Sequence, residues 1–182
     1  MSSEDVKNWI NYKGMEFLKD IGMKKEQYVL DLGCGHGNYT IPASLVVGIK
    51  GRIYAIDKNE ESLIKLTRIL KDKELKNIEI IKLLYKKKLP LLKNSIDLVL
   101  LYDVIHLIEN RNNLFIELHH ILKPKGILSV YPKHHQTHMN MDIDDVREEI
   151  ESFGFFFDKK LYKKLIHDNQ LEDDFLLNFK KI

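Results

Sequence analysis

The chain has 182 residues, of which 44% are hydrophobic and 31% are charged. A chain of this length can bury about 70% of its surface in one core, so we expect a single domain over residues 1–182. The 29 Lys and Arg residues nearly balance the 27 Asp and Glu residues. This balance argues against a broad basic surface for nucleic acid.

A single cysteine, Cys34, excludes an internal disulfide framework and a multi-cysteine metal cluster. The N-terminal sequence lacks the basic start and the apolar stretch of a signal peptide. No run approaches the ~18 apolar residues that a membrane span needs. We therefore expect a cytoplasmic protein with no membrane partner.

In chain order, the first predicted element is an amphipathic helix within residues 1–25, which would cover an edge of a sheet or form a lid. Short apolar runs then alternate with segments of helical period, a pattern typical of a parallel sheet wound with helices. The predicted strands of this region lie at 28–32, 52–56, 78–84, 96–102 and 127–131.

Between and after these strands, the sequence predicts helices at 60–72, 111–122 and 142–153. Asn59 can cap the first of them, and a Lys-Pro-Lys-Gly turn at 123–126 should end the second. Two further strands, 155–167 and 175–182, should pair antiparallel across a polar turn at 168–174. The predicted fold is an α/β, Rossmann-like, doubly wound and mostly parallel seven-stranded sheet, with an antiparallel C-terminal strand and helices on both faces.

The most informative stretch runs from Val29 to Thr40 and reads VLDLGCGHGNYT. A buried strand there enters a glycine-rich turn that opens a helix, so backbone amides face a ligand at the carboxyl edge of the sheet. The glycines follow a G-x-G-x-G spacing. A dinucleotide fingerprint needs glycine at its sixth position, where this chain has Asn38. The spacing therefore disfavours a nicotinamide cofactor.

A second feature is Asp57, directly after the apolar run at 52–56, where its carboxylate can accept both hydroxyls of a ribose. The glycine turn, with Asp31 before it, resembles the first motif of class I S-adenosylmethionine-dependent methyltransferases. LPLLKNSIDLV at 89–99 and LKPKG at 122–126 are similar to later segments of that family. The resemblance covers residues 28–133. The segments at 89–99 and 122–126 are similar to those of the ubiquinone/menaquinone-biosynthesis branch of the family.

The resemblance implies S-adenosylmethionine as the cofactor and S-adenosylhomocysteine as the product. The glycine turn would pack against the methionine part, Asp57 would hold the ribose, and Asp31 would orient the amino group. Tyr85 departs from the family pattern, because many relatives carry an acid there for the adenine amino group. The remaining implied cofactor contacts are Gly33, Cys34, Gly35 and Gly37 in the turn, Lys58 along the adenine ring, and Leu84 and Tyr85 at its edge.

Asp103 and His106 follow the predicted strand 96–102, at the edge where a methyl acceptor should lie. His106 is a candidate general base because an unperturbed histidine titrates near neutrality. Asp103 is a candidate both for catalysis and for binding the cofactor's ammonium group. In the alternative interpretation, which we weight more heavily, His106 only packs or caps and Asp103 only binds the cofactor.

Two loops at the same edge carry titratable groups. His134, His135 and His138 follow the fifth strand, and a solvated or substrate-facing loop is favoured over a metal site. The run Lys86–Lys88 follows the third strand and suits either a solvated loop or an anionic substrate. We assign no metal. Cys34 is interpreted as a small residue in a tight turn rather than a nucleophile.

The sequence thus predicts a methyltransferase for an unidentified acceptor, with a small molecule favoured. Nucleic acid stays an alternative partner, although 96–106 lacks the Asp/Asn-Pro-Pro-aromatic motif of base amino-methyltransferases. A homodimer is compatible with this interpretation. Two rival hypotheses remain: a non-catalytic S-adenosylmethionine-binding or RNA-associated protein, and an NAD-dependent oxidoreductase.

Overall fold

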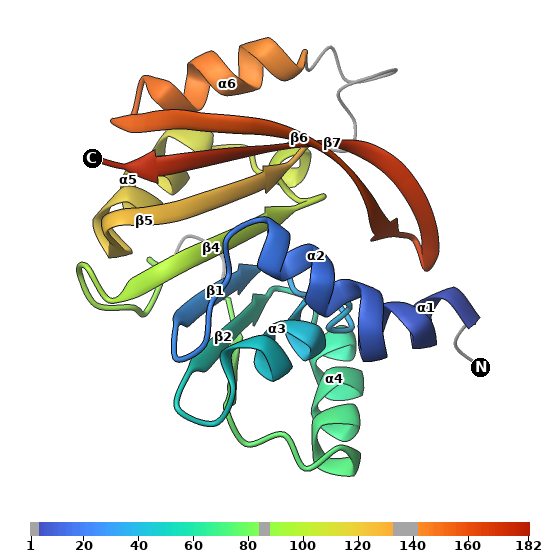
Figure 1. Cartoon of the computed structure of the whole chain (residues 1–182). Helices are drawn as coiled ribbons and strands as arrows, with labels where there is room; N and C mark the ends of the chain where they lie inside the picture. The colour runs from blue at the N-terminus through green and yellow to red at the C-terminus, as the bar shows by residue number, and fades with distance from the viewer. Residues whose placement is uncertain (1–3, 84–87, 133–141) are drawn as a thin grey trace.

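The computed structural model describes residues 4–83, 88–132 and 142–182. Within these residues one seven-stranded sheet runs in the order β3-β2-β1-β4-β5-β7-β6 (Figure 1). The strands from β3 to β5 are parallel, whereas β7 pairs antiparallel with both β5 and β6. The predicted fold class is therefore confirmed. The strands are β1 (Tyr28–Leu32), β2 (Arg52–Asp57), β3 (Ile78–Lys82), β4 (Ile96–Tyr102), β5 (Leu122–Tyr131), β6 (Phe155–His167) and β7 (Gln170–Lys181).

Three of the described helices begin at polar side chains that cap them. Asn59, Asn110 and Asp142 each accept a backbone N–H of the first turn that follows, which satisfies a donor that has no partner within the helix. Among the described residues, no helix combines the length and the apolar character of a bilayer span. The helical elements are α1 (Glu4–Asn8), η1 (Trp9–Lys13), α2 (Gly14–Asp20), α3 (Thr40–Val47), α4 (Glu60–Asp72), η2 (Ile105–Leu107), α5 (Arg111–Ile121) and α6 (Ile143–Glu151).

The sheet is buried on both faces because alternate residues of its central strands pack against different helices. Val29, Leu98 and Leu100 belong to a core with the N-terminal helices and α3. Leu30 and Val99, on the other face, belong to the core built with α5 and α6. This alternation explains why the strands read as continuous apolar runs in the sequence.

The N-terminal helix contains a π-helical segment, η1, between α1 and α2. Gly14 ends this segment, and a Cβ there would lie 2.8 Å from the Trp9 carbonyl oxygen and 3.0 Å from Pro42 Cγ. Glycine therefore lets this helix approach α3 closely. The buried ring of Trp9 packs 5.3 Å from Phe17 and 5.4 Å from Tyr39, measured between ring centroids. The predicted N-terminal helix is thus present, and it is packed against the body of the protein.

Three predicted boundaries were wrong. The strand expected at 78–84 ends at Lys82, because its partner β2 ends at Asp57. The turn expected at 123–126 is a bulge inside β5, because Leu122 already pairs with Ile96. The turn expected at 168–174 shrinks to two residues of positive φ, Asp168 and Asn169, because the acidic residues after them pair within β7.

Three predicted helix ends also moved by one or two residues. The helix predicted at 111–122 ends at Ile121, and the helix predicted at 142–153 spans Ile143–Glu151 with Asp142 as its cap.

The order of the strands fixes where a ligand can bind. The chain leaves β1 for β2 and β3 on one side of the sheet, and it returns to β4 on the other side of β1. Ligands of open α/β sheets bind beyond the carboxyl ends of the strands at such a reversal. The carboxyl ends of β1, β2 and β4 are therefore the place to look for a site.

Candidate functional site

The glycine turn follows β1, and all its glycines have positive φ: +80° at Gly33, +51° at Gly35 and +89° at Gly37. A Cβ at Gly33 would lie 2.3 Å from Val104 Cγ2, and one at Gly37 would lie 2.4 Å from Leu66 Cδ1. These two glycines therefore make room for the protein's own side chains. A Cβ at Gly35 would meet nothing within 4 Å. Gly35 is the glycine that leaves space for a ligand.

Asp57, at the end of β2, lies directly beside this open position. Its Oδ2 accepts the N–H of Gly35 at 2.8 Å, and its Oδ1 accepts the N–H of Asn59 at 2.8 Å. Each carboxylate oxygen keeps a second lone pair for a ligand hydroxyl. The turn and the carboxylate, which the sequence singled out separately, thus form one site. Lys58, the next residue, is exposed.

Asp31 lies inside this site with only 3% of its surface exposed. Thr40 Oγ1 donates a hydrogen bond of 2.5 Å to its Oδ2. Burial raises the pKa of Asp31 to about 7, an effect that the Thr40 hydrogen bond opposes and the nearby Asp57 charge reinforces. A cationic group brought next to Asp31 would stabilise its carboxylate form. The residues present therefore suit a ligand that carries an ammonium group.

Cys34 is buried within the turn, and burial raises the pKa of its thiol far above the usual range. A thiol with a raised pKa gives little thiolate at neutral pH, which makes it a poor nucleophile. This agrees with its interpretation as a small packing residue.

Asp103 follows β4 at φ +53°, and its backbone N–H donates to the Tyr131 carbonyl at 3.0 Å. The next residue, Val104, is the one that fills the space above Gly33. This contact brings the end of β4 next to the glycine turn. His106 Nδ1 lies 3.9 Å from Asp103 Oδ1, so the structure brings these two predicted residues together.

A second histidine, His167, reaches the same carboxylate from the end of β6. Its Nδ1 lies 2.8 Å from Asp103 Oδ2, closer than His106. Sequence reasoning placed His167 at the end of the predicted strand 155–167 and gave it no role in the site. No local signal could have found it, because the contact depends on the register of the β6–β7 hairpin.

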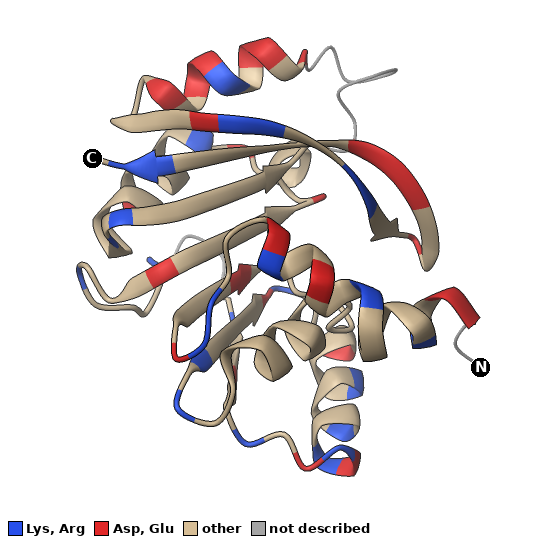
Figure 2. Cartoon of the chain, viewed as in Figure 1, with Lys and Arg blue, Asp and Glu red and all other residues tan. Residues whose placement is uncertain are grey.

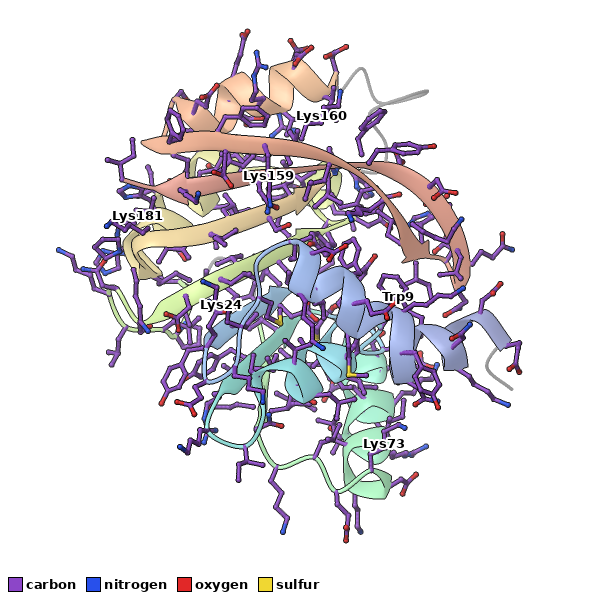
Figure 3. All side chains as sticks on the ribbon, viewed as in Figure 1. Trp9, Lys24, Lys73, Lys159, Lys160 and Lys181 are labelled. Carbon is purple, nitrogen blue, oxygen red and sulfur yellow. The ribbon has the colours of Figure 1, made fainter. Side chains whose placement is uncertain are left out.

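Aromatic side chains connect the N-terminal helix to this edge of the sheet. Trp9 Nε1 donates to the Asn38 carbonyl at 2.8 Å, just after the glycine turn. Tyr39 OH donates to the Ile166 carbonyl at 2.8 Å, which joins the turn to the hairpin that carries His167. Figure 3 labels Trp9 on this helix and shows Lys181 on the opposite side of the view. The N-terminal helix and the β6–β7 hairpin thus each contact residues at the end of the glycine turn.

Several predicted site residues lie outside the described residues: Leu84 and Tyr85 at the expected adenine edge, Lys86 and Lys87 of the lysine run, and His134, His135 and His138. Among the residues that the structure does describe, no group of three or more His, Cys, Asp or Glu side chains is arranged to hold a metal ion.

Comparison with known proteins places this chain in a family. A family model described as "Methyltransferase domain" matches residues 23–170. A probable cobalt-precorrin-6B C(15)-methyltransferase (decarboxylating) of Saccharolobus solfataricus is 51% identical over 67 residues, which is 36% of this chain and 33% of that protein. A demethylmenaquinone methyltransferase of Staphylococcus aureus is 31% identical over 113 residues, 61% of this chain and 45% of that protein. The chain thus spans less than half the length of these two curated relatives.

Solved structures support the fold. A SAM-dependent methyltransferase from Aquifex aeolicus matches with a TM-score of 0.79 and 23% identity, over 97% of this chain and 93% of that one. A SAM-dependent O-methyltransferase from Thermotoga maritima matches with a TM-score of 0.69 and 14% identity, over 98% of this chain and 71% of that one. Because the family model covers most of the chain, the chain belongs to the methyltransferase domain family, and its fold is the Rossmann-like fold of these enzymes.

Proposed function

We propose that this protein is an S-adenosylmethionine-dependent methyltransferase that acts on a small-molecule acceptor. The observation that carries the proposal is the pairing of Gly35 with Asp57. An open backbone position and a carboxylate with spare lone pairs lie 2.8 Å apart, from the Gly35 nitrogen to Asp57 Oδ2. S-adenosylmethionine needs the open backbone position for its methionine part and the carboxylate for its ribose.

The chain's own residues would divide the binding of the cofactor among them. Asp57 would accept the ribose hydroxyls, and the backbone from Gly33 to Gly37 would follow the methionine part. Asp31, buried and close to neutrality in its pKa, would pair with the ammonium group. Lys58, together with Leu84 and Tyr85, would border the adenine ring. When bound, S-adenosylmethionine supplies a methyl group that its sulfonium already makes electrophilic, and it leaves as S-adenosylhomocysteine.

Asp103 and His106 would lie on the acceptor side of the site. The protein has to align the acceptor's lone pair with the S–C bond and, where the acceptor requires it, to remove a proton. Asp103 lies between the glycine turn, through Val104, and the two histidines. This position lets its carboxylate serve either the cofactor's ammonium group or a base.

The choice of a small molecule rests on the relatives. Those of Saccharolobus solfataricus and Staphylococcus aureus are named for cobalt-precorrin-6B and demethylmenaquinone. We infer a soluble cytoplasmic enzyme, one domain over residues 1–182, and an N-terminal helix that covers the site. A homodimer and an RNA acceptor remain secondary hypotheses. A non-catalytic protein would bind S-adenosylmethionine and transfer no methyl group to metabolite, peptide or RNA pools.

The proposal is tested by calorimetric titration of S-adenosylmethionine into the wild type and into Asp57→Ala. Loss of the ribose hydrogen bonds should weaken binding by ~1 to 3 kcal/mol, roughly 5- to 150-fold. Asp97→Ala is a matched control at the other end of the sheet, because Asp97 also accepts a backbone N–H, that of Tyr28 at 2.8 Å. It should lower stability and leave the affinity intact. Equal affinities in the wild type and Asp57→Ala would remove Asp57 from the site. Tight NAD(H) binding without S-adenosylmethionine binding would replace the proposal with an oxidoreductase.

A further inference from the structure

His167 occupies the last position of β6 and lies between two carboxylates. Its Nδ1 is 2.8 Å from Asp103 Oδ2, and its Nε2 is 3.2 Å from Asp168 Oδ2. The side chain of His167 is 13% exposed, whereas that of Asp168 is 88% exposed. The Asp103 contact is therefore the sheltered one. The Asp168 contact lies at the surface, where an incoming ligand can displace it.

From this arrangement we propose that His167 is the general base of the methyl transfer, that Asp103 positions it, and that the acceptor is a neutral molecule with a reactive hydroxyl group. The inference rests on the proposed function and names a catalytic residue and a substrate class for it. A carboxylate that accepts a hydrogen bond from one ring nitrogen orients a histidine, so that its other ring nitrogen can take a proton from a nucleophile.

The step balances without a further reactant. With the Nδ1 proton donated to Asp103, Nε2 carries the lone pair that takes the proton from the acceptor's O–H group. The acceptor oxygen forms a bond to the methyl carbon, and the electron pair of the S–C bond passes to sulfur. The products are the methyl ether, S-adenosylhomocysteine and a protonated His167. The carboxylate of Asp103, still at Nδ1, then stabilises the imidazolium cation.

The need for a base indicates a hydroxyl acceptor. A neutral amine attacks with its own lone pair and loses its proton afterwards, whereas a neutral hydroxyl group is a weak nucleophile until its proton is removed. A histidine–carboxylate pair therefore accelerates methyl transfer to a hydroxyl group more than methyl transfer to an amine.

The charges around His167 favour a neutral acceptor over an anionic one. Asp103 and Asp168 flank the ring, and the ring of Tyr131, 6.4 Å away, has its OH directed to further acids. Tyr131 OH donates to Glu172 Oε1 at 2.7 Å and lies 3.3 Å from Asp174 Oδ2. Figure 2 shows an acidic band along the first part of β7, in which the charge of Asp173 is compensated by Lys164 of β6 at 2.6 Å. A carboxylate or phosphate on the acceptor would be repelled here.

The hairpin that carries His167 is attached to the cofactor side of the site. The Tyr39 hydroxyl donates to the Ile166 carbonyl, one residue before His167, and Tyr39 itself follows the glycine turn. Asp103 is joined to the same turn, because Val104 packs on Gly33. Both members of the pair are thus fixed relative to the position proposed for the cofactor, as alignment with an S–C bond requires.

The test measures methyl transfer from labelled S-adenosylmethionine to 1,4-dihydroxynaphthalene, a neutral diphenol, with mass spectrometry of the product. In His167→Ala, kcat should fall about 100-fold or more, while the affinity for S-adenosylmethionine stays within about twofold of wild type. Added imidazole should restore part of the lost rate. His167→Asn, which can still donate to Asp103 but cannot take a proton, should fold and be equally slow. His120→Ala, on the exposed side of α5, is the matched control and should match the wild type.

The outcomes separate the hypotheses. A wild type that fails to bind S-adenosylmethionine overturns the proposed function itself. A wild type that binds it and does not methylate the diphenol, or that prefers the anionic 1,4-dihydroxy-2-naphthoate, overturns the acceptor class. A kcat of His167→Ala within about threefold of the wild-type kcat overturns the role of His167. The same holds if imidazole fails to restore the kcat of His167→Ala and His167→Asn keeps the wild-type kcat. An imidazole-rescued loss in His106→Ala alone would assign the base to His106 instead.

Discussion

Gly35 provides the most direct test of how the glycine turn works. A Cβ at this position would meet no protein atom within 4 Å, whereas a Cβ at Gly33 would lie 2.3 Å from Val104 Cγ2. Gly35→Ala therefore places a methyl group where we propose that the cofactor lies, without a clash inside the protein. Gly33→Ala has the opposite effect and forces Val104 to move.

The expected magnitudes follow from this geometry. Gly35 has φ +51°, and a left-handed backbone costs an alanine about 1–2 kcal/mol, so Gly35→Ala should lose about that much stability. Gly33→Ala has φ +80° and adds an overpacking cost of about 1–3 kcal/mol. For S-adenosylmethionine, the methyl group of Gly35→Ala removes a close backbone approach. Its affinity should fall about 10-fold or more, equivalent to about 1.4 kcal/mol.

The assay combines urea unfolding with calorimetric titration of S-adenosylmethionine. Gly48→Ala is the matched control, because Gly48 also has a positive φ, +70°, and open space around its Cβ position, but it follows α3. This control should lose stability and keep its affinity. A Gly35→Ala protein that binds S-adenosylmethionine as tightly as the wild type would refute the idea that the open position receives the cofactor.

Three further predictions concern the buried polar groups. Because burial raises the folded-state pKa of Asp31 from 3.8 to about 7, the folded chain keeps a proton that the unfolded chain loses, and the unfolding free energy should fall as pH rises from about 4 to 7. Asp31→Asn should remove this pH dependence of the unfolding free energy, which amounts to at most about 4 kcal/mol between about pH 4 and 7. Urea titrations across that pH range measure it, and an unchanged pH dependence in Asp31→Asn would contradict the prediction. Lys181→Met should lose about 2–4 kcal/mol of stability and no cofactor affinity, since its Nζ donates to Asn94, His119 and Leu122 oxygens at 2.6–2.8 Å. Trp9→Phe should cost about 1 kcal/mol for the hydrogen bond to Asn38, measured by thermal unfolding; no loss would make that bond irrelevant.

The sequence alone determined the parts of this protein that are encoded locally. Short apolar runs predicted the five parallel strands, and Asn59 predicted the start of α4, where it accepts the Ser62 N–H at 3.0 Å. The G-x-G-x-G spacing and Asp57 predicted the two halves of the proposed cofactor site. Each of these signals depends on residues a few positions apart, and the chain adopts the same local conformation wherever the element lies.

Strand ends were less well determined because each depends on a partner elsewhere in the chain. β3 stops where β2 stops, and β5 starts early because Leu122 finds Ile96. The acidic residues expected in a loop at 168–174 lie mostly in β7, where Lys164 Nζ pairs with Asp173 Oδ2 at 2.6 Å. Acidic residues have a low intrinsic propensity for strands and are common in turns, but here the pairs that they form across the two strands outweigh that propensity.

Only the tertiary structure decided how the site is assembled. It gave Gly35 and Asp57 a shared hydrogen bond, left Gly35 open while crowding Gly33, and brought His167 to Asp103 from the far end of the chain. These contacts follow from the reversal of strand order at β1 and from the register of the β6–β7 hairpin. Such contacts are set by the packing of whole elements, and the spacing of residues along the chain does not encode them.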